Sequence, residues 1–203
     1  MTTMSLKILI IFVPLVLSIK SLAQPLASDD QIAWAKKAAP ENITDKASYL
    51  ALEKNSNSGL WEYVKKIQGD NNFTCLLLTD PQGRFEPSCL NEQAMKTVFP
   101  VYQFQTQSLY AGISIQDIDN SILEMVNKGK LPKPTHGELV YMMSNDNKWY
   151  DHVEKVMTFP PPHLMFFQES MDDGIYNLSD SVSLVKLSHP YPHLSVLIIQ
   201  LKN

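Results

Sequence analysis

Two cysteines, Cys75 and Cys89, constrain the fold of this 203-residue chain more than any other feature, because they are the only two. They lie 89 − 75 = 14 positions apart, and a disulfide that closes a loop of this size stabilises a protein by about 3 kcal/mol in the chain-entropy model. The alternative for two thiols is a metal or redox site, but the spacing matches neither C-x-x-C nor a four-ligand zinc pattern. In an exported protein the pair therefore predicts a structural disulfide.

The residues around Cys75 predict a strand, and those after Cys89 predict a helix. The stretch 73–78 is a short apolar run with turn residues before and after it. Asn91 is suited to cap a helix, and apolar residues then recur at helical spacing at Ala94, Met95, Val98, Phe99 and Tyr102. We therefore expect the disulfide to fasten a strand to the start of a helix.

The first 23 residues have the three parts of a secretory signal peptide. Lys7 supplies positive charge, 8–19 is an apolar core, and Ser21 and Ala23 place small residues at a cleavage site before Gln24. The core is too short for a comfortable membrane span. We expect a periplasmic or secreted protein, cleaved after Ala23, without a membrane span and with a single domain over 24–203.

The charge of the chain argues against a nucleic-acid partner. The formal net charge is −4, and loss of Lys7 and Lys20 with the signal peptide brings it to −4 − 2 = −6. Nucleic-acid binding requires a basic surface, which this composition does not predict. The physiological partner stays unknown at this stage.

The order of the predicted elements indicates an α+β fold. Helices are expected at 29–38 and at 114–127, where Ser114 caps the start and Gly129 ends the last turn. Strands are expected to follow mainly in the C-terminal part, which predicts an antiparallel sheet with helices packed on one face. The expected strands are 47–52, 60–67 in a hairpin with 73–78, 137–144, 162–167, 182–187 and 193–201.

Two histidines, His163 and His193, have the clearest chemical potential. Each follows a proline and opens an apolar run, in PPPHLMFF and PYPHLSVLII. If the strand 182–187 lay between their strands, both imidazoles would lie at one end of the sheet. Imidazole combined with thioethers such as Met142 and Met165 suits copper, especially Cu(I), and Glu92 could add a carboxylate. The alternative is that the methionines fill the core and that each histidine bonds to backbone.

The sequence carries no catalytic signature. It has no G-x-S-x-G elbow, and its seven glycines form no phosphate-binding loop. Whether the protein is an enzyme therefore stays open. No cofactor is predicted, with copper or zinc as the alternative.

Six fragments resemble, in this order, a loose family of uncharacterised exported bacterial proteins: APENIT, NFTCL, PSCLNEQAM, ELVYMM, PPPHLMFF and PYPHLSVLI. The family's motifs are G-[WF]-T-C, P-x-C-L-[DN]-E, a Y-M pair, P-H-x-M and P-Y-x-H, and this chain has Asn72-Phe73 where Gly-Trp is usual. The resemblance implies no established activity, cofactor or substrate. It singles out the matching motif positions, which are Cys75, Cys89, Glu92, Tyr141, Met142, His163, Met165, Tyr191 and His193.

Two functions follow as hypotheses. The first is a non-enzymatic exported binding or interaction protein, which the single core, the disulfide and the lack of catalytic motifs favour. The second is a small enzyme or copper-type metal-handling protein centred on His163 and His193, with Glu92 beside them. Convergence of these three side chains in one pocket would favour the second.

Overall fold

The computed structural model describes residues 24–135, 137–152, 154–169, 176–179, 182–186 and 194–201. The predicted signal peptide, Tyr191 and His193 lie outside the described residues. Among the residues that are described, no helix combines the length and the apolar character needed to cross a membrane.

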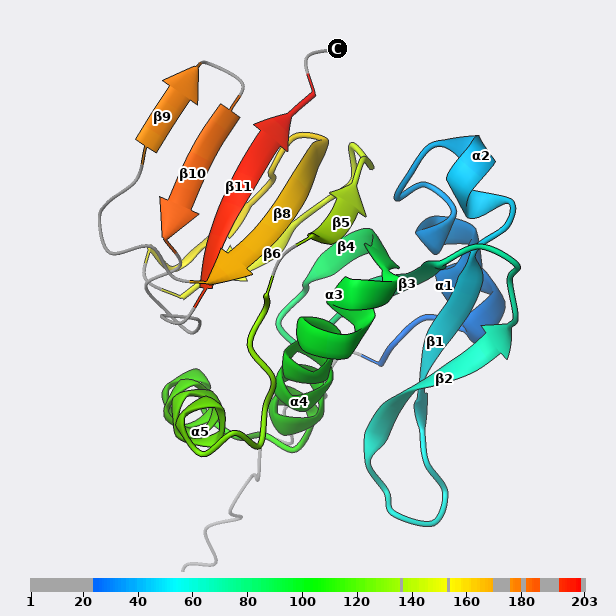
Figure 1. Cartoon of the computed structure of the whole chain (residues 1–203). Coiled ribbons are helices and arrows are strands. Elements are labelled where there is room, and N and C mark those ends of the chain that lie inside the picture. The colour runs from blue at the N-terminus through cyan, green and yellow to red at the C-terminus, as the bar shows by residue number, and fades with distance from the viewer. Residues whose placement is uncertain are drawn as a thin grey trace, which may run out of the picture.

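A mixed sheet organises the described chain, with its strands in the order β2-β1-β3-β4-β5-β8-β11-β10-β9 (Figure 1). Strands β1 and β3 run parallel, and every other neighbouring pair is antiparallel. A separate hairpin consists of β6 (Trp149–Asp151) and β7 (Val156–Thr158). The strands of the large sheet are β1 (Ser48–Lys54), β2 (Trp61–Ile67), β3 (Phe73–Thr79), β4 (Phe85–Asn91), β5 (Glu138–Met142), β8 (His163–Glu169), β9 (Tyr176–Ser179), β10 (Val182–Lys186) and β11 (Leu194–Gln200).

Helices cover both faces of the sheet between β1 and β5, so the α+β class is confirmed but the prediction of helices on one face is wrong. On one face Ala35 and Ala38, from α1 and the turn after it, pack with the two cysteines. On the other face Leu90 packs with Ala94 of α3. The physical reason lies in β3, where 75–78 are all buried, as expected for a strand covered on both sides. The helices are α1 (Ser28–Ala35), α2 (Glu41–Thr44), α3 (Glu92–Thr97), α4 (Phe99–Tyr110) and α5 (Ile115–Asn127).

The predicted hairpin between 60–67 and 73–78 is wrong, because β2 pairs with β1 and not with β3. The turn after β2 explains this difference. The amides of Asp70 and Asn71 both donate to the Lys46 carbonyl, and a Cβ at Gly69 would lie 2.2 Å from that oxygen. Since only glycine permits this approach, the turn passes the start of β1 and delivers β3 to the opposite side of β1, in parallel.

Beyond their short paired region β1 and β3 separate, and side chains bond the backbone groups that the strands leave free. Gln31 of α1 donates from Nε2 to the Leu52 carbonyl at 3.0 Å and accepts from the Leu52 amide at 2.8 Å. The Tyr63 hydroxyl donates to the Leu77 carbonyl and accepts from the Thr79 amide. An unpaired buried backbone group costs about 1–3 kcal/mol, so these two side chains stabilise the separation of the strands.

The helix signals were predicted closely from local sequence. Ser114 accepts from the Asp117 amide at the start of α5, and Gly129 has a φ of 67° just after its end. Asn91 caps α3 as expected, by accepting from the Ala94 amide. The expected apolar stripe continues into a second helix, α4, which has Pro100 in its first turn.

Candidate functional site

Cys75 and Cys89 form the predicted disulfide. They face each other in register on the neighbouring strands β3 and β4, so the bond joins two strands and not a strand and a helix start. The sequence hid β4 because Pro87 lies in it, and proline argues against a central strand. Proline is tolerated there because the described pairing of β4 with β5 is confined to Cys89 and Leu90.

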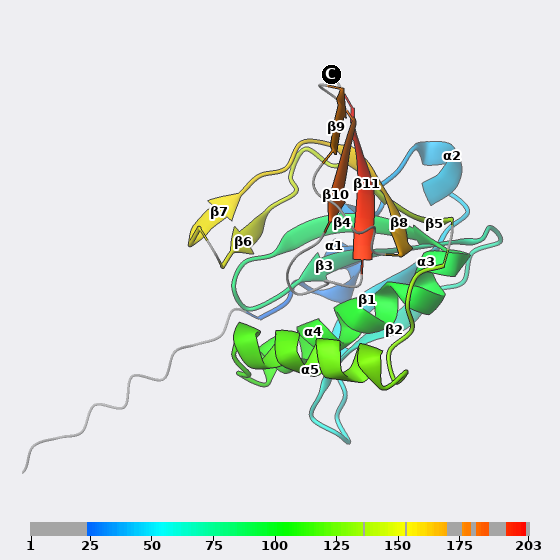
Figure 2. The same ribbon diagram turned by 60° about the vertical axis from the view of Figure 1, so that its left-hand side comes forward.

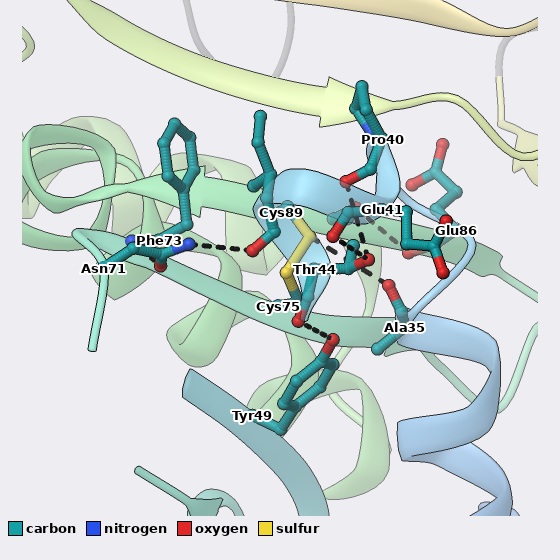
Figure 3. Close-up of a disulfide and its surroundings, with 12 residues drawn as sticks. Ala35, Pro40, Glu41, Thr44, Tyr49, Asn71, Phe73, Cys75, Glu86 and Cys89 are labelled. Atoms are coloured by element: carbon teal, nitrogen blue, oxygen red, sulfur yellow. Dashed lines mark hydrogen bonds between the residues drawn. A yellow bond between two sulfur atoms is a disulfide. The ribbon is translucent and has the colours of Figure 1, made fainter. Parts of the chain in front are cut away.

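The disulfide lies in the core and is closed to solvent. Both cysteines have no exposed surface, and the Cys89 sulfur lies 4.0 Å from the Ala35 carbonyl of α1. Figure 3 shows Tyr49 below the bond, with its hydroxyl donating to the Thr44 carbonyl at 2.6 Å. Burial raises the pKa of the Tyr49 hydroxyl. Because reagents and metal ions have no access to the buried sulfurs, the geometry identifies a structural cross-link.

Tyr141 lies in line with Cys75 and Cys89 on the face of the sheet that packs against α1. It lies opposite Cys89 across β4 and β5. Its ring packs edge-on against Phe73, with the ring centroids 5.7 Å apart. These contacts make Tyr141 a packing residue beside the disulfide.

Met142, His163 and Met165 lie together on the opposite face of the sheet. Met142, the last residue of β5, pairs directly with His163, the first residue of β8. Met165 is two positions along β8 and therefore points to the same side. The His163 ring is buried, and its Nδ1 lies 2.7 Å from the Pro161 carbonyl. Because a carbonyl oxygen only accepts, Nδ1 carries a proton in this contact.

The expected strand order, with 182–187 between the strands that His163 and His193 open, is wrong, and His193 itself lies outside the described residues. Strands β8 and β11 are direct antiparallel neighbours, and β10 lies on the outer side of β11. Leu194, the first residue of β11, pairs with Glu169 at the far end of β8, while His163 pairs with Gln200. The two strand starts therefore lie at opposite ends of the sheet (Figure 1).

Glu92, the carboxylate proposed for the same site, lies at the exposed start of α3. Its Oε1 accepts from the Lys96 ammonium at 2.7 Å, and this bond lowers the pKa of the Glu92 carboxyl. Glu92 also borders an open hollow of about 270 Å³. Several polar groups of the hollow already bond within the protein, such as Lys65 to Gln68 at 2.8 Å. The lining residues are Ser48, Leu50, Lys65, Gln68, Asn71, Asn72, Thr74, Glu92 and Met95.

Exposed apolar residues, which the sequence did not indicate, lie on the hairpin β6–β7 and directly after it. Trp149, Val156 and Phe159 are 37 %, 52 % and 69 % exposed. The start of the hairpin is fixed to the sheet, because Lys148 exchanges two backbone hydrogen bonds with Phe85 at 2.8 and 2.9 Å. Figure 2 shows the hairpin projecting beyond the edge of the sheet layer. The signal in the sequence was the pair of short runs WYD and VMTF, which are too short to stand out as strands.

A buried polar cluster lies between α4 and the β3–β4 turn. The Arg84 guanidinium donates to the Glu86 carboxylate at 2.5 Å and lies over the Tyr102 ring, 5.1 Å from its centroid. Burial raises the pKa of Tyr102 and of Tyr63 to about 12. These interactions are satisfied within the protein, so the cluster stabilises the packing of α4.

In the part of the chain that the structure describes, no group of three or more His, Cys, Asp or Glu residues is arranged to hold a metal ion. Comparisons with models of protein families, with curated proteins and with solved structures found no match.

Proposed function

We propose that this protein is an exported, non-enzymatic interaction protein that binds a partner protein through the β6–β7 hairpin. The observation that carries the proposal is the exposure of Trp149 and Val156 on the hairpin and of Phe159 directly after it. Single exposed apolar residues are normal on protein surfaces, whereas several on one projecting segment, two of them aromatic, are typical of an interface.

The charges on the hairpin favour a protein partner over an anionic membrane. Lys148 and Lys155 supply two positive charges, and Asp151 and Glu154 supply two negative charges. A surface that binds acidic lipid needs an excess of lysine and arginine, which this hairpin lacks. Exposed apolar residues interspersed with balanced charges fit the composition of a protein interface.

Local geometry restrains the backbone near the turn of the hairpin and after Phe159. Lys155 has a φ of 56° in the turn, where the Glu154 amide donates to the Asp151 carboxylate at 3.0 Å. Phe159 precedes three prolines, each of which fixes its own φ near −65°. Because a rigid anchor loses little conformational entropy on binding, Phe159 has the properties of a binding hot spot.

Export is the second part of the proposal, and it rests on the signal-like residues 1–23 and on the disulfide. Structural disulfides persist in oxidising compartments. N-terminal sequencing of the protein recovered outside the cytoplasm should begin at Gln24. Recovery of the chain in the cytoplasm with 1–23 attached would contradict this part.

Site-specific photo-crosslinking tests the binding surface. A photoreactive phenylalanine analogue at position 159 should give one discrete cross-linked protein in the native host. The same analogue at Leu123, an exposed apolar residue of α5, is the matched control and should not give that product. Phe159→Ala should then weaken binding of the identified partner at least ~10-fold, while Leu123→Ala should not change it. Equal cross-linking at both positions, cross-linking only to a second copy, or no product would contradict the proposal.

A further inference from the structure

We propose that Met142, His163 and Met165 form a binding site for Cu(I). Register places Met142 directly opposite His163 on neighbouring strands, and Met165 on the same face two positions along β8. Directly paired residues have Cβ atoms about 4.5–5.5 Å apart, and a residue two positions along the strand lies about 7 Å away. Three long side chains at this spacing can converge on one ion between them. Figure 1 shows the end of β5 and the start of β8 at the same end of the sheet.

The hydrogen bond of His163 prepares its ring for metal binding. Nδ1 donates to the Pro161 carbonyl at 2.7 Å, which orients the ring and leaves Nε2 as the nitrogen with a free lone pair in the neutral form. Histidines that bind metals commonly donate their other N–H to a backbone carbonyl in this way.

The ligand set selects the ion. One imidazole and two thioethers are neutral and soft, so they suit a monovalent soft ion such as Cu(I) better than Zn²⁺ or Ca²⁺. The carboxylate of Glu138 lies on the same face but four positions before Met142, and it bonds to Thr97 and to the Thr135 amide. Both cysteines are bonded to each other, so no thiolate competes for the ion.

The site has a route to solvent. Met165 is partly exposed, and Gln200, which pairs with His163 at the end of β11, is exposed. An ion can therefore reach the three ligands from this end of the sheet. Met142 is buried, which keeps the occupied site partly shielded from water.

Anaerobic titration of the purified protein, without a histidine tag, against a chromophoric Cu(I) chelator tests the proposal. The protein should remove one equivalent of Cu(I) from the chelator. Met142→Leu and Met165→Leu keep size and hydrophobicity, and each should weaken the Cu(I) affinity at least ~10-fold. Met95→Leu is the matched control, because Met95 also packs against the core on this face, and it should bind as the unaltered protein does.

A second readout separates ligation from folding. With Ag(I) as a redox-inert substitute, the methyl carbon resonances of Met142 and Met165 should shift while that of Met95 stays in place. His163→Gln should abolish binding, and the two leucine variants keep the test decisive if His163→Gln does not fold. The proposal is overturned if the protein binds no Cu(I), if the leucine variants bind as tightly as the unaltered protein, or if Met95→Leu loses affinity equally.

Discussion

The two halves of the sheet differ in how they are covered. Strands β1, β3, β4 and β5 have helices on both faces and contain the disulfide, whereas Figures 1 and 2 show β8, β11, β10 and β9 extending beyond the helices. In β3 the residues 75–78 are all buried, but in β8 the residues 164–166 are only partly buried. The difference indicates that β1, β3, β4 and β5 form the stable scaffold. The proposed Cu(I) ligands lie where the two halves meet, with Met142 on β5 and His163 and Met165 on β8.

Truncation of core side chains in the two halves should give the largest difference. Leu76→Ala removes a side chain with no exposed surface from the covered half, and such changes cost about 2–5 kcal/mol. Ile198→Ala in β11 removes a partly buried side chain and should cost about 1–2 kcal/mol, because it loses less apolar contact. Urea unfolding of both variants measures this. Equal losses of unfolding free energy would show that the halves are equally packed.

Removal of the disulfide should have the next largest effect on the scaffold. The variant with both Cys75→Ala and Cys89→Ala should lose about 3 kcal/mol of unfolding free energy, because the closed loop spans 14 positions. The unaltered protein, unfolded without reductant, should contain no free thiol. A reductant should destabilise the unaltered protein and leave the double variant unchanged, and two titratable thiols per chain would refute the cross-link.

High pH should act on the covered half through its buried tyrosines. Burial raises the pKa of Tyr63 and of Tyr102 from 10.0 to about 12. The unfolded chain therefore loses these protons first, so their contribution to stability is intact below pH ~10 and is lost as the pH rises toward ~12.

Unfolding in urea between pH 9 and 12 measures this loss, and phenolate absorbance reports which tyrosines ionise late. Tyr63→Phe is the control, because it should be less stable at neutral pH and should lose less stability on further alkalinisation. Ionisation of all eight tyrosines near pH 10 would contradict the burial of this group.

Loss of the Gln31 amide should have a smaller effect in the same half. Gln31→Leu keeps the volume but leaves the Leu52 amide and carbonyl unpaired, which should cost about 2 kcal/mol. Gln103→Leu is the matched control, since its amide makes a similar pair of bonds at the outer, partly exposed edge of β2 and water can replace them. In thermal unfolding, Gln31→Leu should have a lower midpoint temperature than Gln103→Leu. The reverse order would argue against the role given to Gln31.

Features encoded by neighbouring residues were predictable from the sequence, and features created by distant contacts were not. The caps at Asn91 and Ser114 and the strand around Cys75 depend on residues within a few positions of one another. The parallel pairing of β1 with β3 depends on the contact between Gly69 and Lys46. These residues are distant in the sequence, so no local pattern reveals the contact. Strand β4 was not predicted because proline argues against a central strand. Pro87 is tolerated because β4 pairs with β5 only at Cys89 and Leu90, which the sequence does not reveal.

The candidate sites show the same limit. The methionines and His163 were recognised as possible ligands from residue type, but their arrangement depends on strand register. The sequence suggested a partnership between His163 and His193. In the structure the pairing of β5 with β8 places Met142 opposite His163, and Met165 lies on the same face two positions along β8. The exposed hairpin was missed because its strands have only three residues each.

Native-state hydrogen exchange tests the division into scaffold and less covered half most directly. The amides of Cys75 to Leu78 in β3 should exchange only through global unfolding, whereas those of Val196 to Ile198 in β11 should exchange through a smaller opening that is about 2 kcal/mol or more easier. In the variant with both Cys75→Ala and Cys89→Ala, the protection of β3 should fall while the smaller opening of β11 remains. Equal protection of both strands, or stronger protection of β11, would contradict the account.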